Sequence, residues 1–207
     1  WMGTMLHELG HGVYSYYTDR NLPFLLRDAA HAFTTEAVAE YFGALSRDAD
    51  WMKANLAISD GDADRIRPAG MRATRAQKLV FARWDMVMTA FERALYENPD
   101  QDLNGLWWNL VGKYQGVKKP EARNAPDWAA KIHFVMAPCY YHNYLLGEMF
   151  ASQMRAKLAA MPADQVGGFF RSRIFEPGTR YSWNEMIKKA TGEPLNPAYF
   201  TKEVVGE

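Results

Sequence analysis

Apolar residues recur at intervals of three and four along most of the 207-residue chain, which is the periodicity of amphipathic helices. The clearest run predicts one long helix over residues 72–97, which Asn98-Pro99 ends. Its regularly spaced apolar positions are Leu79, Val80, Trp84, Val87, Met88, Phe91 and Leu95. Alternation with a period of two is almost absent, so we expect little sheet. The pattern therefore predicts an all-α, mainly helical fold.

Turn and capping residues divide the rest of the chain into further helices. Thr34 and Thr35 are the expected caps of one helix, and Ser182 with Glu185 forms a capping box at the start of the last one. The ranges expected for the other helices are 2–18, 50–58, 101–115, 138–160 and 163–173. No internal repeat or low-complexity tract interrupts this pattern.

Composition narrows the classes of partner. The chain carries 24 basic and 24 acidic residues, and this balance gives no support to binding of nucleic acid or an anionic membrane. No apolar stretch reaches the length of a transmembrane helix. Cys139 is the only cysteine, so there is no intrachain disulfide, and a bound metal must be held by histidine and carboxylate side chains.

The segment His7-Glu8-Leu9-Gly10-His11 carries the strongest chemical signal. Histidines four apart on a helix lie on one face, so both imidazoles can bind a single metal ion. Glu8 points about 100° round the helix, close enough to hold a water at that ion. Two histidines on a helix can also be ordinary polar residues with partners. The full H-E-x-x-H pattern nevertheless favours a site for one zinc ion, with two ligands and a general base.

A catalytic zinc ion usually takes a third protein ligand. The candidates downstream of the two histidines are Asp19, Asp28, His31, Glu36 and Glu40. Glu36 is favoured because it lies in the first turn of the second helix, which has enough connecting chain to pack against the first. Glu40 is one turn later on the same face, where it can orient a ligand histidine through the free ring N–H. The alternative is that both glutamates belong to a solvated acidic face.

These segments resemble a known family. The pattern from His7 to His11, then Leu22-Pro23, Arg27-Asp28 and the run from Glu36 to Glu40, is similar to the catalytic core of the angiotensin-converting enzyme family. The thimet oligopeptidase and oligoendopeptidase families are close in pattern. All are mainly helical peptidases in which H-E-x-x-H and a distal glutamate bind zinc. The resemblance covers most of the chain and is weakest between about 60 and 120.

The resemblance implies roles for residues in the second half. Lys131-Ile132-His133 and the tyrosine-rich segment after it resemble the family's substrate-binding region. His133 and Tyr144 are thereby expected to hydrogen-bond the oxyanion of the tetrahedral intermediate. Lys131 and Tyr141 are expected to bind the C-terminal carboxylate of the substrate. The spacing is one residue longer than in converting enzyme, so Tyr140 could take the place of Tyr141.

We therefore expect a zinc metallopeptidase that releases C-terminal dipeptides from oligopeptides, with Glu8 as the general base. One alternative is an oligoendopeptidase that cuts internal bonds of short peptides. The other is a non-catalytic metal-binding domain descended from a peptidase. Such descendants should lose the base or the oxyanion donors first, and Glu8, His133 and Tyr144 are all present.

Residues 1–207 are expected to form a single catalytic subdomain from the C-terminal part of a longer peptidase, because the chain opens at Trp1 inside the predicted zinc helix. The missing N-terminal part of the same polypeptide would then form the other wall of the substrate cleft. The sequence does not fix the compartment. Bacterial relatives of this kind are often exported, which leans towards a periplasmic or secreted protein.

Overall fold

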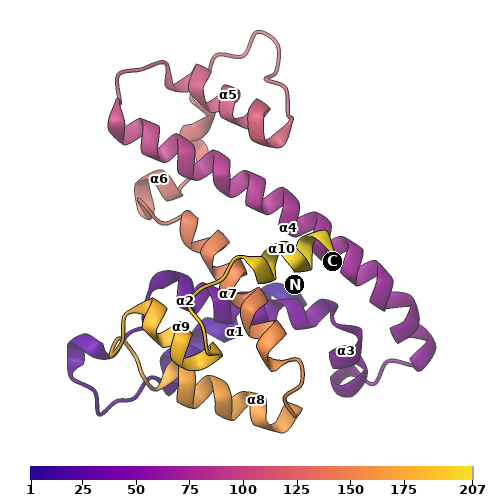
Figure 1. Cartoon of the computed structure of the whole chain (residues 1–207). Helices are drawn as coiled ribbons and strands as arrows, with labels where there is room; N and C mark the ends of the chain where they lie inside the picture. Colours follow the sequence, from indigo (N-terminus) through magenta and orange to yellow (C-terminus); the bar gives the residue numbers. More distant parts are fainter. Residues whose placement is uncertain (207) are drawn as a thin grey trace. The chain divides into compact units, whose positions relative to one another are not determined.

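The computed structural model describes residues 1–206, and within them the chain is helical and contains no strand (Figure 1). This confirms the predicted all-α fold. None of the described helices is both long and apolar enough to span a membrane. The α-helices are α1 Met2–Tyr17, α2 Ala32–Ala44, α3 Ala49–Leu56, α4 Asp60–Glu97, α5 Leu103–Gln115, α6 His133–Met136, α7 His142–Leu158, α8 Ala163–Phe170, α9 Trp183–Thr191 and α10 Ala198–Val205.

The helix that carries H-E-x-x-H and the helix predicted over 101–115 are confirmed as α1 and α5. The capping box before α9 is also confirmed, since a Glu185 carboxylate oxygen accepts the Ser182 N–H at 3.1 Å. Gly192 follows α9 in a left-handed conformation at φ 90° and closes that helix. Local capping chemistry therefore set these boundaries as the sequence indicated.

The predicted cap of the second helix is wrong by three residues. Helix α2 starts at Ala32, and the residue before it, His31, has an extended backbone. The His31 Nδ1 accepts the Phe33 N–H at 3.4 Å, and Thr34 Oγ1 accepts the His31 N–H at 3.2 Å. Thr34 thus serves the third helical position rather than the cap. Thr35, the other expected cap, is free to act elsewhere.

The long helix also starts earlier than predicted, at Asp60 rather than residue 72. The segment Ser59-Asp60-Gly61-Asp62, which follows the helix expected over 50–58, has the composition of a turn. Instead, Ser59 Oγ accepts the Asp62 N–H at 3.1 Å, as a capping residue does. The actual break is one turn before, where Ala57 adopts a left-handed conformation at φ 53° after α3. The helix then continues through Pro68 without ending.

The helix predicted over 138–160 is shorter at its start, because α7 begins only at His142. Cys139 has φ 56°, which a helix cannot contain. The helix predicted over 163–173 is α8 followed by a π-helical segment, η4, at Arg171–Phe175. Helix α10 was not predicted at all. Short 3₁₀ segments complete the fold: η1 Phe24–Leu26, η2 Leu45–Arg47 and η3 Asp127–Ala130.

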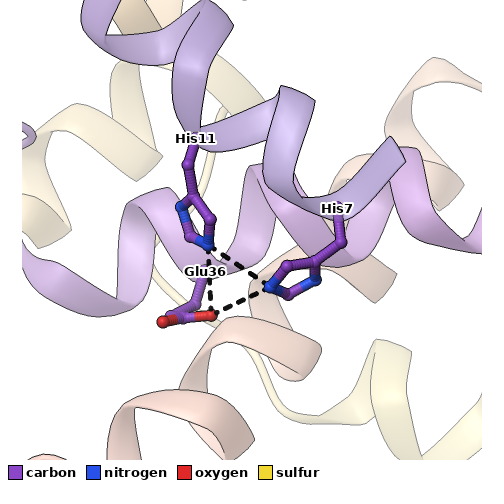
Figure 2. Close-up of side chains that lie close together, drawn as sticks. All are labelled: His7, His11 and Glu36. Carbon is purple, nitrogen blue, oxygen red and sulfur yellow. Dashed lines mark hydrogen bonds and ion pairs between the residues drawn. The ribbon is translucent and has the colours of Figure 1, made fainter. Parts of the chain in front are cut away.

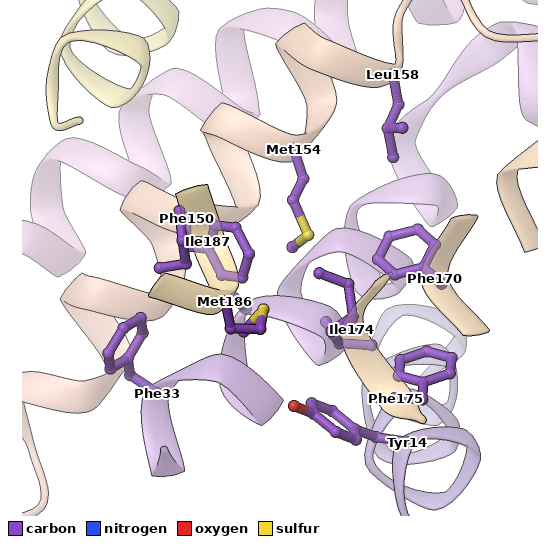
Figure 3. Packing of buried hydrophobic residues seen from close by; sticks show 12 residues of the cluster. Tyr14, Phe33, Phe150, Met154, Leu158, Phe170, Ile174, Phe175, Met186 and Ile187 are labelled. Carbon is purple, nitrogen blue, oxygen red and sulfur yellow. The ribbon is translucent and has the colours of Figure 1, made fainter. Parts of the chain in front are cut away.

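The chain divides into two compact units. The first contains Trp1–Arg75 and the chain from Leu146 to the C-terminus. Its core draws side chains from α1, α2, α7, α8, η4 and α9 to a common centre (Figure 3). The fully enclosed members are Tyr14, Phe33, Ala37, Val38, Phe150, Met154, Phe170, Ile174, Met186 and Ile187. Phe33, Ala37 and Val38 therefore place one face of α2 in this core.

Two glycines allow the backbones around α2 to approach very closely. A Cβ on Gly10 of α1 would lie 2.8 Å from the Ala39 Cα, and a Cβ on Gly147 of α7 would lie 2.9 Å from the Glu36 Cβ. Both distances are shorter than any normal carbon–carbon contact. Only glycine at these positions lets α1 and α7 pack in direct contact with the α2 backbone. This close packing determines how far Glu36 lies from the two histidines of α1.

The second unit contains residues Ala76–Leu145. Its core is built on α4, where Val87, Met88 and Phe91 are fully buried. Trp107 of α5 packs edge-on against Phe91 with ring centroids 5.2 Å apart. Phe134 of α6 closes the cluster, with its ring centroid 5.2 Å from that of Phe91. The rigid aromatic core gives the loop between α6 and α7 a firm base.

Candidate active site

Three predicted ligands converge in the first unit (Figure 2). The Nε2 atoms of His7 and His11 are 3.3 Å apart. The Glu36 Oε2 lies 3.6 Å from the first of them and 3.7 Å from the second. Zinc–ligand distances near 2.0–2.2 Å in a tetrahedron place neighbouring ligand atoms roughly 3.3–3.6 Å apart. The triangle therefore fits one zinc ion.

Each histidine ring is also held at its outer nitrogen. The Nδ1 of His11 is 2.8 Å from the Thr35 Oγ1, and the Nδ1 of His7 is 3.5 Å from a carboxylate oxygen of Glu40. Such partners fix the tautomer that leaves Nε2 free to bind a metal. Glu40 thus lies where the sequence placed it. Thr35 was missed, because a threonine before an apolar run looks like a helix cap.

The burial of Glu36 and His7 favours binding of a metal ion at this cluster. Glu36 is only 4% exposed, and a buried carboxylate needs a positive partner. Burial lowers the pKa of His7, and this effect exceeds the opposing attraction of Glu36. The imidazole is therefore held in the neutral form that binds zinc. A buried carboxylate beside two imidazole nitrogens is a donor set that suits a divalent cation.

Glu8 lies on the exposed side of α1. It makes no ion pair in the described part of the chain, so its carboxylate is accessible to water. The position one residue after a candidate metal-binding histidine, on an accessible face, suits a general base. The other candidates for a third ligand are used differently: Asp19 pairs with Arg180 at 3.1 Å, and His31 caps α2.

The second unit brings together the residues expected to bind the oxyanion. The Nε2 of His133 lies 3.3 Å from the Tyr144 hydroxyl. The Tyr141 ring packs against both, with centroid distances of 4.8 Å to His133 and 5.1 Å to Tyr144. Tyr140 stands edge-on to Tyr144 at 5.4 Å. His133 and the three tyrosines therefore form one aromatic cluster with polar groups at its edge.

Lys131 and Tyr141 both contact Trp84, one of the regularly spaced apolar residues of the long helix. The Trp84 Nε1–H donates a hydrogen bond to the Tyr141 hydroxyl at 2.9 Å. The Lys131 Nζ lies over the Trp84 ring, 4.9 Å from its centroid, which is within the range of a cation–π interaction. The sequence held no signal for this role, because Trp84 shares its spacing with the buried face of α4.

The chain between α6 and α7 owes its shape to a buried glutamate on α4. Glu92, which is 6% exposed, accepts the Cys139 N–H at 2.6 Å. This hydrogen bond holds Cys139 in its left-handed conformation and delays the start of α7 to His142. The turn places Tyr140 and Tyr141 just before the helix, with Tyr144 in its first turn. Glu92 was also missed by the sequence analysis.

Comparison with known proteins agrees with this arrangement. Residues 2–205 match the model of peptidase family M3. The angiotensin-converting enzyme-like protein Ace3 of Mus musculus is 22% identical over 92% of this chain and 28% of its own length. The angiotensin-converting enzyme of Bos taurus is 24% identical over 90% of the chain and 16% of its length. The chain thus spans less than a third of these curated relatives.

Solved structures share the fold at similarly low identity. A crystal structure titled BsuCP superposes with a TM-score of 0.75 at 20% identity, covering 97% of this chain and 46% of that one. The M32 carboxypeptidase of Deinococcus radiodurans R1 gives a TM-score of 0.75 at 19% identity, with 97% and 46% coverage. Trypanosoma cruzi metallocarboxypeptidase 1 gives 0.71 at 16%, with 96% and 48% coverage. These likenesses establish the helical architecture.

Proposed function

Because the chain belongs to peptidase family M3, we propose that the protein is a zinc metallopeptidase that releases C-terminal dipeptides from oligopeptides. The observation that carries the proposal is the triangle of His7, His11 and Glu36, whose donor atoms lie 3.3–3.7 Å apart. A bound zinc ion supplies a Lewis acid and lowers the pKa of water. Glu40 and Thr35 keep both histidine rings in the orientation that binding requires.

In this proposal Glu8 performs the proton transfers. Its exposed carboxylate accepts the proton of the attacking water and then delivers it to the amine that leaves. His133 and Tyr144 donate hydrogen bonds to the oxyanion that forms when the water attacks the scissile carbonyl. Their mutual contact at 3.3 Å supports a joint role, because two donors must converge to serve one oxygen atom. Removal of one such donor typically lowers the turnover rate by roughly 100- to 1,000-fold.

The specificity for a free C-terminus rests on Lys131 and Tyr141. The Lys131 ammonium has no ion pair among the residues that the structure describes. The Tyr141 hydroxyl accepts from Trp84 and so retains its own proton for donation. Lys131 and Tyr141 both contact Trp84, one at the ring face and the other at the indole N–H, and an ammonium with a hydroxyl donor suits the two oxygens of a peptide carboxylate. Binding of the C-terminal carboxylate would favour cleavage of a bond near that end of the peptide.

The test is cleavage of one short peptide in two forms, as the free acid and as the C-terminal amide. The zinc-loaded protein should be used in the longest form that its gene encodes. Mass spectrometry should show loss of a dipeptide from the free acid and little cleavage of the amide. Internal cleavage of both forms would instead identify an oligoendopeptidase. No cleavage of either, with zinc bound, would favour a non-catalytic metal-binding domain.

A further inference from the structure

Trp84 contacts both Lys131 and Tyr141, the two residues that the proposed function assigns to recognition of the substrate carboxylate. Its indole N–H donates to the Tyr141 hydroxyl, and its ring lies below the Lys131 ammonium. We propose that Trp84 is the positioning residue for the C-terminal carboxylate of the substrate, acting through Tyr141 and Lys131. This inference rests on the proposed function, since it assigns the group that makes the recognition pair effective.

The direction of the hydrogen bond is fixed by chemistry. An indole N–H can only donate, so the Tyr141 oxygen is the acceptor. That bond occupies a lone pair and turns the tyrosine O–H towards another acceptor. Within residues 1–206 the structure shows no acceptor for this proton. Tyr141 is 9% exposed, so a ligand oxygen that reached it would form a hydrogen bond protected from water.

The contact with Lys131 serves the same end. A cation over an indole face keeps its charge and its three N–H donors while its flexible stem is confined. An ion pair with an acidic side chain would have neutralised the ammonium before any substrate arrived. Cation–π contact therefore holds the ammonium over the Trp84 ring without using up its capacity to bind an anion. Both donors are thereby organised in advance, which lowers the entropy lost on binding.

Trp84 is itself rigid enough for this role. The Trp107 ring packs edge-on against it with centroids 5.6 Å apart. Trp84 also belongs to the turn of α4 that carries Asp85, Val87 and Met88, all of which are buried. A side chain fixed by the aromatic core on one side can present its N–H and its face in constant directions on the other.

The test compares Trp84→Phe with Trp108→Phe. Phenylalanine at position 84 keeps an aromatic ring for packing but removes the N–H and weakens the cation–π contact. Trp108 is the matched control, because it is in the same unit and its Nε1–H donates to Asp127 at 3.0 Å, remote from Tyr141 in the hydrogen-bond network. We expect Trp84→Phe to lower kcat/KM for the free-acid peptide about tenfold, mainly through KM. Trp108→Phe should change it less than about twofold.

A direct binding measurement removes the dependence on turnover. In the Glu8→Gln protein, which should be inactive, calorimetry with the product dipeptide as free acid should give a Kd about tenfold weaker after Trp84→Phe. Adding Trp84→Phe to a Tyr141→Phe protein should have a smaller effect than in the parent, less than about threefold, because both changes remove the same interaction. Additive effects of the two changes would contradict action through Tyr141.

The outcomes separate this inference from the proposed function. If the unaltered protein cleaves free acid and amide equally, the carboxylate assignment itself is wrong. If the unaltered protein prefers the free acid and Trp84→Phe keeps that preference in full, the proposed function stands and the role of Trp84 is refuted. A Trp84→Phe protein that loses activity on both peptides equally would show a structural role only, which also overturns the inference.

Discussion

Replacing Gly10 by alanine should weaken zinc binding, although Gly10 is not a ligand. Its Cβ would lie 2.8 Å from the Ala39 Cα and 3.2 Å from the Ala39 N. A normal carbon–carbon contact is about 3.5–4.0 Å, so α1 and α2 must separate locally by roughly 0.7–1.2 Å. His11 follows Gly10 directly, and Glu36 is one turn before Ala39 on α2. Metal–ligand distances tolerate only about 0.2 Å, so the ligands must lose their common centre or strain must build up.

The magnitude follows from the cost of overpacking. Inserting a methyl group into a closely packed contact costs about 1–3 kcal/mol. If the helices of the metal-free protein separate to relieve this strain, zinc binding must bring them back together and so reintroduce the strain. The zinc Kd then rises roughly 5- to 150-fold. Alanine also favours a helix over glycine by about 1 kcal/mol, so the stability of the metal-free protein should fall only slightly or remain unchanged.

Gly12→Ala provides the matched control. Gly12 is on the same helix, next to His11 on its other side, and a Cβ there would meet nothing within 4 Å. This variant should bind zinc as the unaltered protein does and gain up to about 1 kcal/mol in stability. Zinc affinity is measured by competition with a chromophoric chelator, and stability by urea unfolding in the absence of metal. Equal zinc affinity for the two variants would refute the argument that Gly10 sets the spacing of the ligands.

Two further predictions concern the metal-binding and base residues and one buried acid. Glu36→Ala should lose stoichiometric zinc by elemental analysis and keep its helical circular dichroism; a full zinc complement would contradict the ligand assignment. Glu8→Gln should keep zinc and lose peptide cleavage. Turnover by Glu8→Gln would contradict its role as the general base. Burial raises the pKa of Asp85 to about 7, so its carboxyl group is protonated in the folded state at pH 5 but ionised in the unfolded chain. Stability should therefore fall as the pH rises from about 4 to about 7, by at most about 4 kcal/mol, and Asp85→Asn should remove this slope in urea unfolding at pH 5 and pH 8; an unchanged slope would refute it.

The cluster of three candidate metal ligands was predictable because its signal is local. His7, His11 and Glu36 lie within two consecutive helices, and helical periodicity alone decides which faces they occupy. The packing of those helices needed only an apolar face on each. A single cysteine also leaves no competing set of cysteine ligands. The contact of Thr35 with His11 could not be predicted, because a threonine at this position was expected to cap the helix. His31 caps it instead, which is a rare use of an imidazole.

The contacts that hold Tyr141 and the turn at Cys139 in place could not be predicted, because they join segments that are distant in the sequence. Trp84 and Tyr141 are 57 positions apart, and Glu92 and Cys139 are 47 apart. A tryptophan at helical spacing is most often a core residue, and Trp84 does pack on the core with one edge. Its contacts with Lys131 and Tyr141 depend on how the chain before α7 folds back onto α4. The left-handed turn at Cys139 has no sequence signal either, because it is stabilised by Glu92 rather than by a glycine.

The proposed metal ligands and the proposed carboxylate-binding residues belong to different compact units, and this separation gives the variants distinct signatures. His7, His11, Glu36 and their ring partners all lie in the unit that holds α1 and α2. Trp84 and Lys131 belong to the other unit, with its own aromatic core. A change at Trp84 should therefore leave zinc affinity unaltered, whereas Gly10→Ala should weaken zinc binding without changing the preference for a free C-terminus in the zinc-saturated protein. Zinc affinity and carboxylate preference are thus two independent measurements, and a variant that altered both would show that the two units depend on each other for their local structure.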